Sequence, residues 1–154
     1  MPLRYELKRD ICNILIVSFS GNLQDDDLRT FKDVFNHRFI ECEKLPKRER
    51  SFSLIIDMRD VSAISPNLII DLARYMSECE PLINKYLVSS SIIVSNEWIK
   101  TIINMFFTIR KPTKPNCVTT TYELAYEFIK DYSEIYSLGS ASHSSSGSTN
   151  SKKK

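Results

Sequence analysis

Residues 51–76 read SFSLIIDMRDVSAISPNLIIDLARYM, and this stretch decides the fold. Residues 52–58 are apolar almost throughout and rich in β-branched side chains, a pattern typical of a strand covered on both faces. Ser65 followed by Pro66 indicates a helix start, because the serine hydroxyl can accept a hydrogen bond from a helical amide and proline fits the first helical position. The stretch therefore predicts a central strand, a polar turn and a helix.

The rest of the chain predicts strands and helices that alternate around this centre. Segments 4–8 and 13–20 predict an opening hairpin, and the aspartates at 25–27 begin a helix whose dipole they suit. Later elements follow in order: a short helical piece over 82–87, a strand over 88–94, a helix from Glu97, a strand over 117–119 and a last helix capped by Thr120. This order predicts an α/β fold, with an open mixed β-sheet of about five strands and four main helices.

Apolar spacing within these elements predicts the core. The predicted central helix carries apolar residues three and four positions apart, and the predicted strands are apolar along their length. We expect the following residues to be buried together: Ile55, Ile56, Leu68, Leu72, Ile93, Ile102 and Phe128. The helix from Trp98 to Phe107 has an unusually wide apolar face, which is either core or in part a partner surface.

The run LIIDMRDVSAIS-PNLIIDLARYM resembles the centre of the STAS domain, the fold of the bacterial anti-sigma-factor antagonists. In that family a strand ends in Asp and leads through a D-S-S-G-L turn into a helix. The resemblance extends, in order of elements, over about residues 5–132 and includes the ending TTTYELAYEFI. It implies a STAS-like fold and a regulatory protein-binding function.

One departure from the family concerns its phosphorylation switch. In phosphorylated STAS proteins a serine of the turn is the kinase target, whereas Pro66 or Asn67 stands at that position here, depending on the alignment. Neither side chain can be phosphorylated. The switch is therefore not carried over, and Ser65 is the nearest hydroxyl.

Two classes of function follow from these observations. We prefer a non-catalytic protein-interaction module that contacts a partner through the turn 60–67 and the adjoining helix, with these candidate residues: Asp60, Ser62, Ser65, Pro66 and Asn67. The alternative is a small-ligand or anion-binding carrier or sensor that uses the amides at the start of the central helix. A concave site near Ser65 favours a ligand, and a convex one favours a protein.

Composition limits the remaining possibilities. The 154 residues fit one domain over 1–137, followed by a Ser-rich tail over 138–154 that we expect to be disordered. The net charge of +2 depends on the three terminal lysines, without which acidic residues slightly outnumber basic ones. Such a balance argues against nucleic acid as a partner. We expect a protein partner, and the sequence does not decide whether the chain also forms a homodimer.

Sequence motifs predict neither a cofactor nor a metal. The four cysteines have no C-x-x-C pair and no neighbouring histidine, so we expect structural thiols: Cys12, Cys42, Cys79 and Cys117. The aspartates at 25–27 lack the spacing of a calcium loop. No nucleophile elbow, phosphate loop or dinucleotide fingerprint is present, so we expect no enzyme. The absence of an apolar signal core or a run of about 20 apolar residues predicts a cytoplasmic protein that does not bind a membrane.

Overall fold

A computed structural model describes residues 3–9 and 12–144 of the chain, with side chains as far as residue 133. Within that part, strands and helices alternate after an opening hairpin. Their bounds are β1 Leu3–Arg9, β2 Asn13–Asn22, α1 Asp25–Lys44, a short 3-10 helix Lys47–Glu49, β3 Phe52–Ala63, α2 Pro66–Glu78, α3 Glu80–Tyr86, β4 Leu87–Ile93, α4 Glu97–Ile109, β5 Asn116–Thr119 and α5 Tyr122–Ser144.

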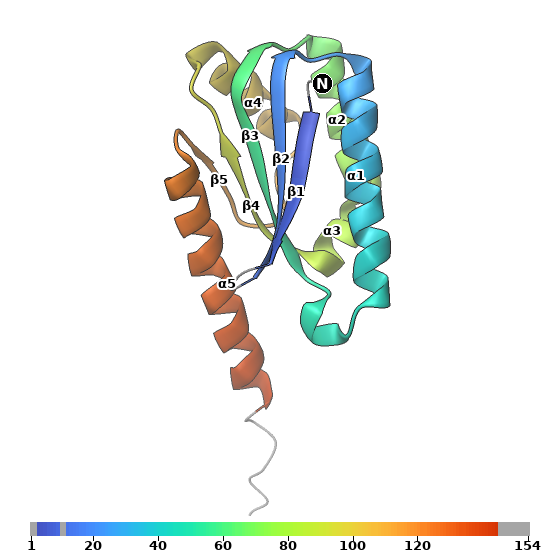
Figure 1. Cartoon of the computed structure of the whole chain (residues 1–154), viewed down its shortest axis with the longest axis vertical. Helices are drawn as coiled ribbons and strands as arrows, with labels where there is room; N and C mark the ends of the chain where they lie inside the picture. Colours follow the sequence, from blue (N-terminus) through green and yellow to red (C-terminus); the bar gives the residue numbers. More distant parts are fainter. Residues whose placement is uncertain (1–2, 10–11, 145–154) are drawn as a thin grey trace, which may run out of the picture.

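The five strands form one mixed sheet in the order β1-β2-β3-β4-β5. β1 is antiparallel to β2, and the other neighbours are parallel (Figure 1). β3 lies in the middle and is the strand that the sequence places at the centre. The structure thus confirms the predicted α/β fold with an open mixed sheet, and the predicted short piece after the central helix is α3.

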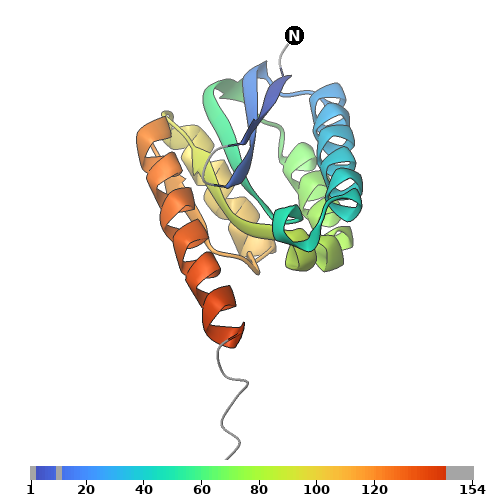
Figure 2. The same ribbon diagram turned by 60° about the horizontal axis from the view of Figure 1, so that its bottom comes forward.

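Helices cover both faces of the sheet. Residues of α1, α2, α3 and α4 share one hydrophobic cluster with one face, whereas Ala125 and Ile129 of α5 belong to a second cluster on the other face. Figure 2 shows α1 and α5 on opposite sides of the strands. The hydroxyl of Ser91 on β4 donates to the carbonyl of Ala125 at 3.2 Å, which fixes α5 against the sheet.

The prediction of a single buried core is wrong. Ile55 and Ile93 lie on the α5 face, whereas Leu68 and Ile102 lie on the opposite face. Ile56, Leu72 and Phe128 are only partly buried against these clusters. The physical reason is the pleat of β3, which sends neighbouring side chains such as Ile55 and Ile56 to opposite faces of the sheet.

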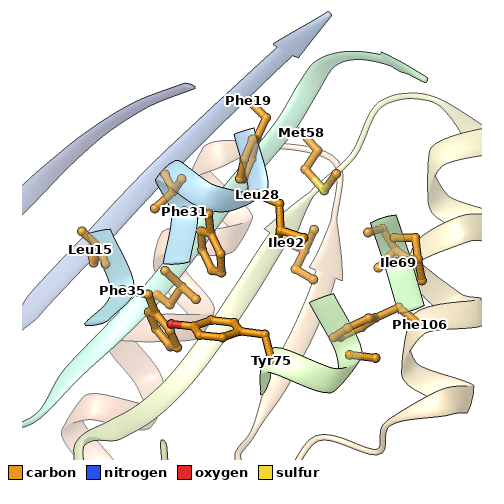
Figure 3. Close-up of a cluster of buried hydrophobic side chains, with 14 of the residues drawn as sticks. Leu15, Phe19, Leu28, Phe31, Phe35, Met58, Ile69, Tyr75, Ile92 and Phe106 are labelled. Atoms are coloured by element: carbon orange, nitrogen blue, oxygen red, sulfur yellow. The ribbon is translucent and has the colours of Figure 1, made fainter. Parts of the chain in front are cut away.

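Aromatic side chains make up much of the larger cluster. Phe35 is fully buried on α1, and its ring centroid lies 4.6 Å from that of Phe39 and 6.0 Å from that of Phe52 on β3. Figure 3 shows Phe31 and Phe35 of α1 beside Tyr75 of α2. Phe35 meets Phe39, Phe52 and Tyr75 edge-on, and Phe31 stacks on Phe35. Both arrangements are favourable for aromatic pairs, so α1 is held firmly over β2 and β3.

Both ends of α5 differ from the prediction. The cap is Thr121 rather than Thr120, because the Thr121 hydroxyl accepts from the amide of Leu124 at 3.2 Å. The helix continues to Ser144 and so passes the boundary placed at Leu138. Extending an existing helix adds one hydrogen bond per residue without a new nucleation cost. Residues 145–154 of the predicted tail lie outside the described residues.

Candidate functional site

The far end of β3 carries the predicted interaction residues. The pairing of β3 with β4 ends at Asp57, but its pairing with β2 continues to Ala63. Val61 in this extension is buried in the core. Asp60 and Ser62 are therefore strand residues, because pairing with β2 satisfies the backbone hydrogen-bonding groups beyond Asp57. The turn predicted over 60–67 is shorter than expected and consists of Ile64 and Ser65.

An ion pair marks the point where β3 leaves β4. The guanidinium of Arg59 contacts both carboxylate oxygens of Asp57, at 3.0 Å from Nε and 2.7 Å from a terminal nitrogen. Partial burial raises the pKa of Asp57, but the hydrogen bonds and the charge of Arg59 outweigh it, so the pKa lies below its usual value. The hydroxyl of Ser95 donates to the Arg59 carbonyl at 3.1 Å and joins this end of β3 to the chain before α4.

The start of α2 has the predicted cap. The hydroxyl of Ser65 accepts from the amide of Leu68 at 3.3 Å, and Pro66 occupies the first helical position. On the neighbouring β3, the hydroxyl of Ser62 donates to the side-chain carbonyl of Asn22 at 2.9 Å. The structure therefore confirms the helix start that the sequence predicts at Ser65 and Pro66.

The structure brings the five predicted residues to one end of the sheet. Each of them is exposed: Asp60, Ser62, Ser65, Pro66 and Asn67. Figure 1 shows that the end of β3 and the starts of α2 and α4 lie at the same end of the molecule. The carboxyl ends of parallel strands are a common place for binding sites.

Two exposed apolar side chains lie on the helices that begin at this end of the molecule. Ile70 of α2 is 47% exposed and lies one helical turn after Pro66 and Asn67, and Trp98 in the first turn of α4 is 64% exposed. Periodicity assigned Trp98 to a broad apolar face with Ile99, which is fully buried. Ile70 was not predicted as a site residue, although its position two residues after Leu68, on an otherwise polar helix face, indicates an exposed apolar side chain.

Other chemistry-bearing groups have structural surroundings. Burial raises the pKa of the Cys42 and Cys79 thiols, so both remain protonated at neutral pH. Among the described residues, no three His, Cys, Asp or Glu side chains come together as metal ligands. In that same part of the chain, no helix combines the length and the apolar character needed to cross a membrane.

Comparison with known proteins identifies the fold. No protein-family model matches the chain, and no curated protein matches its sequence. Among solved structures, it is similar to an uncharacterised protein of the DUF3478 family with a SpoIIAA-like fold from Shewanella loihica PV-4, at 14% identity and a TM-score of 0.55. The likeness covers 82% of this chain and 93% of that chain. The chain has the SpoIIAA-like fold.

This fold is that of the STAS domain, so the predicted resemblance is confirmed at the level of the fold. Fold likeness at 14% identity transfers no individual site residue. Any binding role of the surface formed by the C-terminal end of β3 and the start of α2 therefore rests on the side chains of this chain alone.

Proposed function

We propose that this SpoIIAA-like chain is a non-catalytic protein-interaction module of the anti-sigma-factor-antagonist kind. The partner surface is formed by Asp60, Ser62, Ser65, Pro66 and Asn67, with Ile70 as its apolar centre; we call it the α2-start surface. The module acts in regulation by binding a protein in the cytoplasm. Because Pro66 and Asn67 cannot be phosphorylated, binding is constitutive.

The exposure of Ile70 is the observation that carries this proposal. Its side chain is 47% exposed although it follows the buried pair Leu68 and Ile69. It stands beside exposed Asn67 and near Arg74, so an apolar side chain is ringed by polar ones. Protein interfaces have this anatomy, with an apolar anchor at the centre and a polar rim that excludes water.

The polar groups of the α2-start surface suit a specific contact. Asp60 and Asn67 offer hydrogen-bond acceptors, and Asn67 also offers donors. Pro66 and the Ser65 cap hold the start of α2 in one conformation, so little conformational entropy is lost when a partner binds. A rigid, mixed polar and apolar surface favours a folded protein partner over a flexible ligand.

The alternative of an anion held by the start of α2 has less support. Anion binding there requires free amides in the first turn. Pro66 has no amide hydrogen, and the amide of Leu68 donates to the hydroxyl of Ser65. The same cap that stabilises the helix thus uses a donor that an anion needs.

A comparative capture experiment tests the proposal. The wild-type chain, Ile70→Asp and Ile40→Asp are immobilised, and proteins retained from a lysate of the source cells are quantified by mass spectrometry. Ile40 is the matched control, because it is an isoleucine of α1 with 54% exposure in a different helix. We expect Ile70→Asp to lose a protein that both other forms retain. Identical retained sets from all three folded proteins would overturn the α2-start surface.

A further inference from the structure

An apolar cavity lies between the sheet and the helices on the inward side of α2. Its volume is about 110 Å³, and its walls include Met58 and Ile92 from the strands and Ile69, Leu72 and Phe106 from α2 and α4. Figure 3 shows Met58 and Ile92 on the sheet side and Ile69 and Phe106 on the helix side. The side chains of the two layers therefore leave space between them.

This space is large for a protein interior. Native cores are packed as densely as organic crystals and contain few voids larger than a water molecule. A cavity with apolar walls gives water no hydrogen-bond partners, so it stays dry or takes up an apolar guest. An apolar guest would restore the van der Waals contacts that the walls lack.

The cavity reaches the molecular surface at the loop between α4 and β5, because the exposed residues Pro112 and Thr113 are among its lining residues. Ile56 lies on the central strand β3, with β2 and β4 paired on either side. Even so, it is only partly buried, as are Leu72 and Met76 of α2. All three line the cavity. Their partial burial therefore reflects surface that faces the cavity.

One rim of the cavity is positively charged. Arg110 and Lys114, from the loop between α4 and β5, are among its lining residues. A terminal nitrogen of Arg110 donates to the Met76 carbonyl at 3.1 Å, and the hydroxyl of Thr113 donates to the Asn84 side chain at 2.9 Å. These two bonds tie the loop to α2 and α3, and the first holds the Arg110 guanidinium in place.

The acidic residue of the lining lies on a different element. Asp27 belongs to the first turn of α1, and its carboxylate accepts from the backbone amide of Gln24 at 2.8 Å. The Asp27 side chain is buried, and its carboxylate already serves as the acceptor in this capping hydrogen bond. Because Arg110 and Lys114 lie together on one loop, their rim is the part of the cavity that attracts an anion.

We propose that the cavity binds a carboxylate that carries an apolar chain or ring of about six to eight carbons, given that a cavity of comparable size accommodates benzene. The apolar part lies among Leu72, Ile92 and Phe106, and the carboxylate lies at the rim with Lys114 and Arg110. This site is on the inward side of α2 and does not depend on the proposed protein partner.

Calorimetry and methyl NMR with octanoate and octanol test this site in the full chain. The two probes have the same number of carbons in a linear chain, but octanol lacks the charge. Octanoate is expected to bind and to shift the methyl signals of Leu72 and Ile92. Lys114→Gln is expected to weaken octanoate binding about tenfold, the effect of losing one charge-assisted contact, while leaving octanol unaffected. Lys111→Gln is the matched control, because Lys111 is an exposed lysine of the same loop that does not line the cavity.

Two variants fill the cavity from opposite walls. Leu72→Phe and Ile92→Phe add volume from α2 and from β4, and each is checked for cooperative unfolding. Loss of octanoate binding in a folded filled variant supports the site. Absence of methyl shifts at millimolar octanoate, equal binding to the filled variants, or equal effects of Lys114→Gln and Lys111→Gln would overturn it. None of these readouts involves a partner protein, so failure here leaves the α2-start surface untouched.

Discussion

The hydroxyl of Ser65 and the amide of Leu68 are joined by a hydrogen bond of 3.3 Å that begins α2. This bond fixes the start of α2 and therefore which of its residues face solvent and which face the sheet. Asn67 and Ile70 are exposed on the outward face, while Leu68 and Ile69 are buried on the inward face. The interaction surface and the cavity are thus two sides of one capped helix.

Ser65→Ala should lower the free energy of unfolding by about 1 kcal/mol, the usual loss when a helix cap is removed. Urea denaturation of both proteins measures this difference. Ser62→Ala is the control, because its exposed hydroxyl bonds only to the side chain of Asn22 among the contacts described for it. A variant as stable as the wild type would show that Pro66 alone fixes the start of α2.

The Asp57–Arg59 ion pair should make stability depend on pH in the acid range. The pKa of Asp57 in the folded protein lies below its ordinary value of 3.8, so the ionised form is the one that folding favours. The stabilisation is complete above pH of about 4 and is lost as the pH falls through the ordinary and then the folded pKa. Asp57→Asn removes this contribution at every pH.

Urea denaturation between pH 6 and pH 3 checks the direction in which stability changes with pH. The stability difference between the wild type and Asp57→Asn should shrink as the pH falls below about 4. Arg59→Gln removes the side chain whose hydrogen bonds and charge outweigh burial, so the acid-range loss of stability due to Asp57 should disappear in this variant. A difference that stays constant over the range would mean that Arg59 does not stabilise the Asp57 carboxylate.

Ile55→Ala should destabilise the protein by roughly 2 to 5 kcal/mol through lost transfer energy and a new cavity. Ile55 is fully buried in the middle of the sheet. Leu72→Ala should cost less, because Leu72 is only partly buried and already borders a cavity. Denaturant midpoints of the two variants decide the order, and a larger loss for Leu72→Ala would contradict this view of the core.

Truncation after Ser137 should leave the melting temperature unchanged within error. The buried residues that hold α5 to the sheet are Ala125 and Ile129, both well before the cut. The removed residues are mostly Ser, Gly, Ala and Lys, which have little apolar surface to bury. A clear fall in calorimetric melting temperature would show that the end of the chain contacts the domain.

Strong local signals allowed much of the fold to be predicted. Ser65 and Pro66 specify a helix start by their own chemistry, and the apolar run before them specifies a covered strand. In any strand Ile55 and Ile56 point to opposite faces, but a continuous apolar run does not indicate which of them faces α5. Thr120 and Thr121 are adjacent potential caps, and only the backbone geometry distinguishes them.

The site was predicted less completely than the fold. The sequence indicates that Asp60 to Asn67 connects a strand to a helix, but pairing with β2 extends β3 to Ala63. The exposure of Ile70 and Trp98 depends on how α2 and α4 pack against other elements. The apolar periodicity of the sequence does not determine that packing. The cavity arises from the fit of several elements, so no single stretch of sequence encodes it.

The affinity of Asn67→Asp for the captured partner tests whether the α2-start surface binds that partner. A new carboxylate at an interface must lose its water, which should weaken binding about tenfold. The same charge suits a helix start, so the free energy of unfolding should change by less than about 0.5 kcal/mol. Asn104→Asp is the control, because Asn104 is an exposed asparagine of α4.

Titration calorimetry with the purified partner gives the dissociation constants. We expect weaker binding by Asn67→Asp, with equal dissociation constants for Asn104→Asp and the wild type. Equal dissociation constants for all three proteins would contradict this expectation and would place the partner surface away from the start of α2.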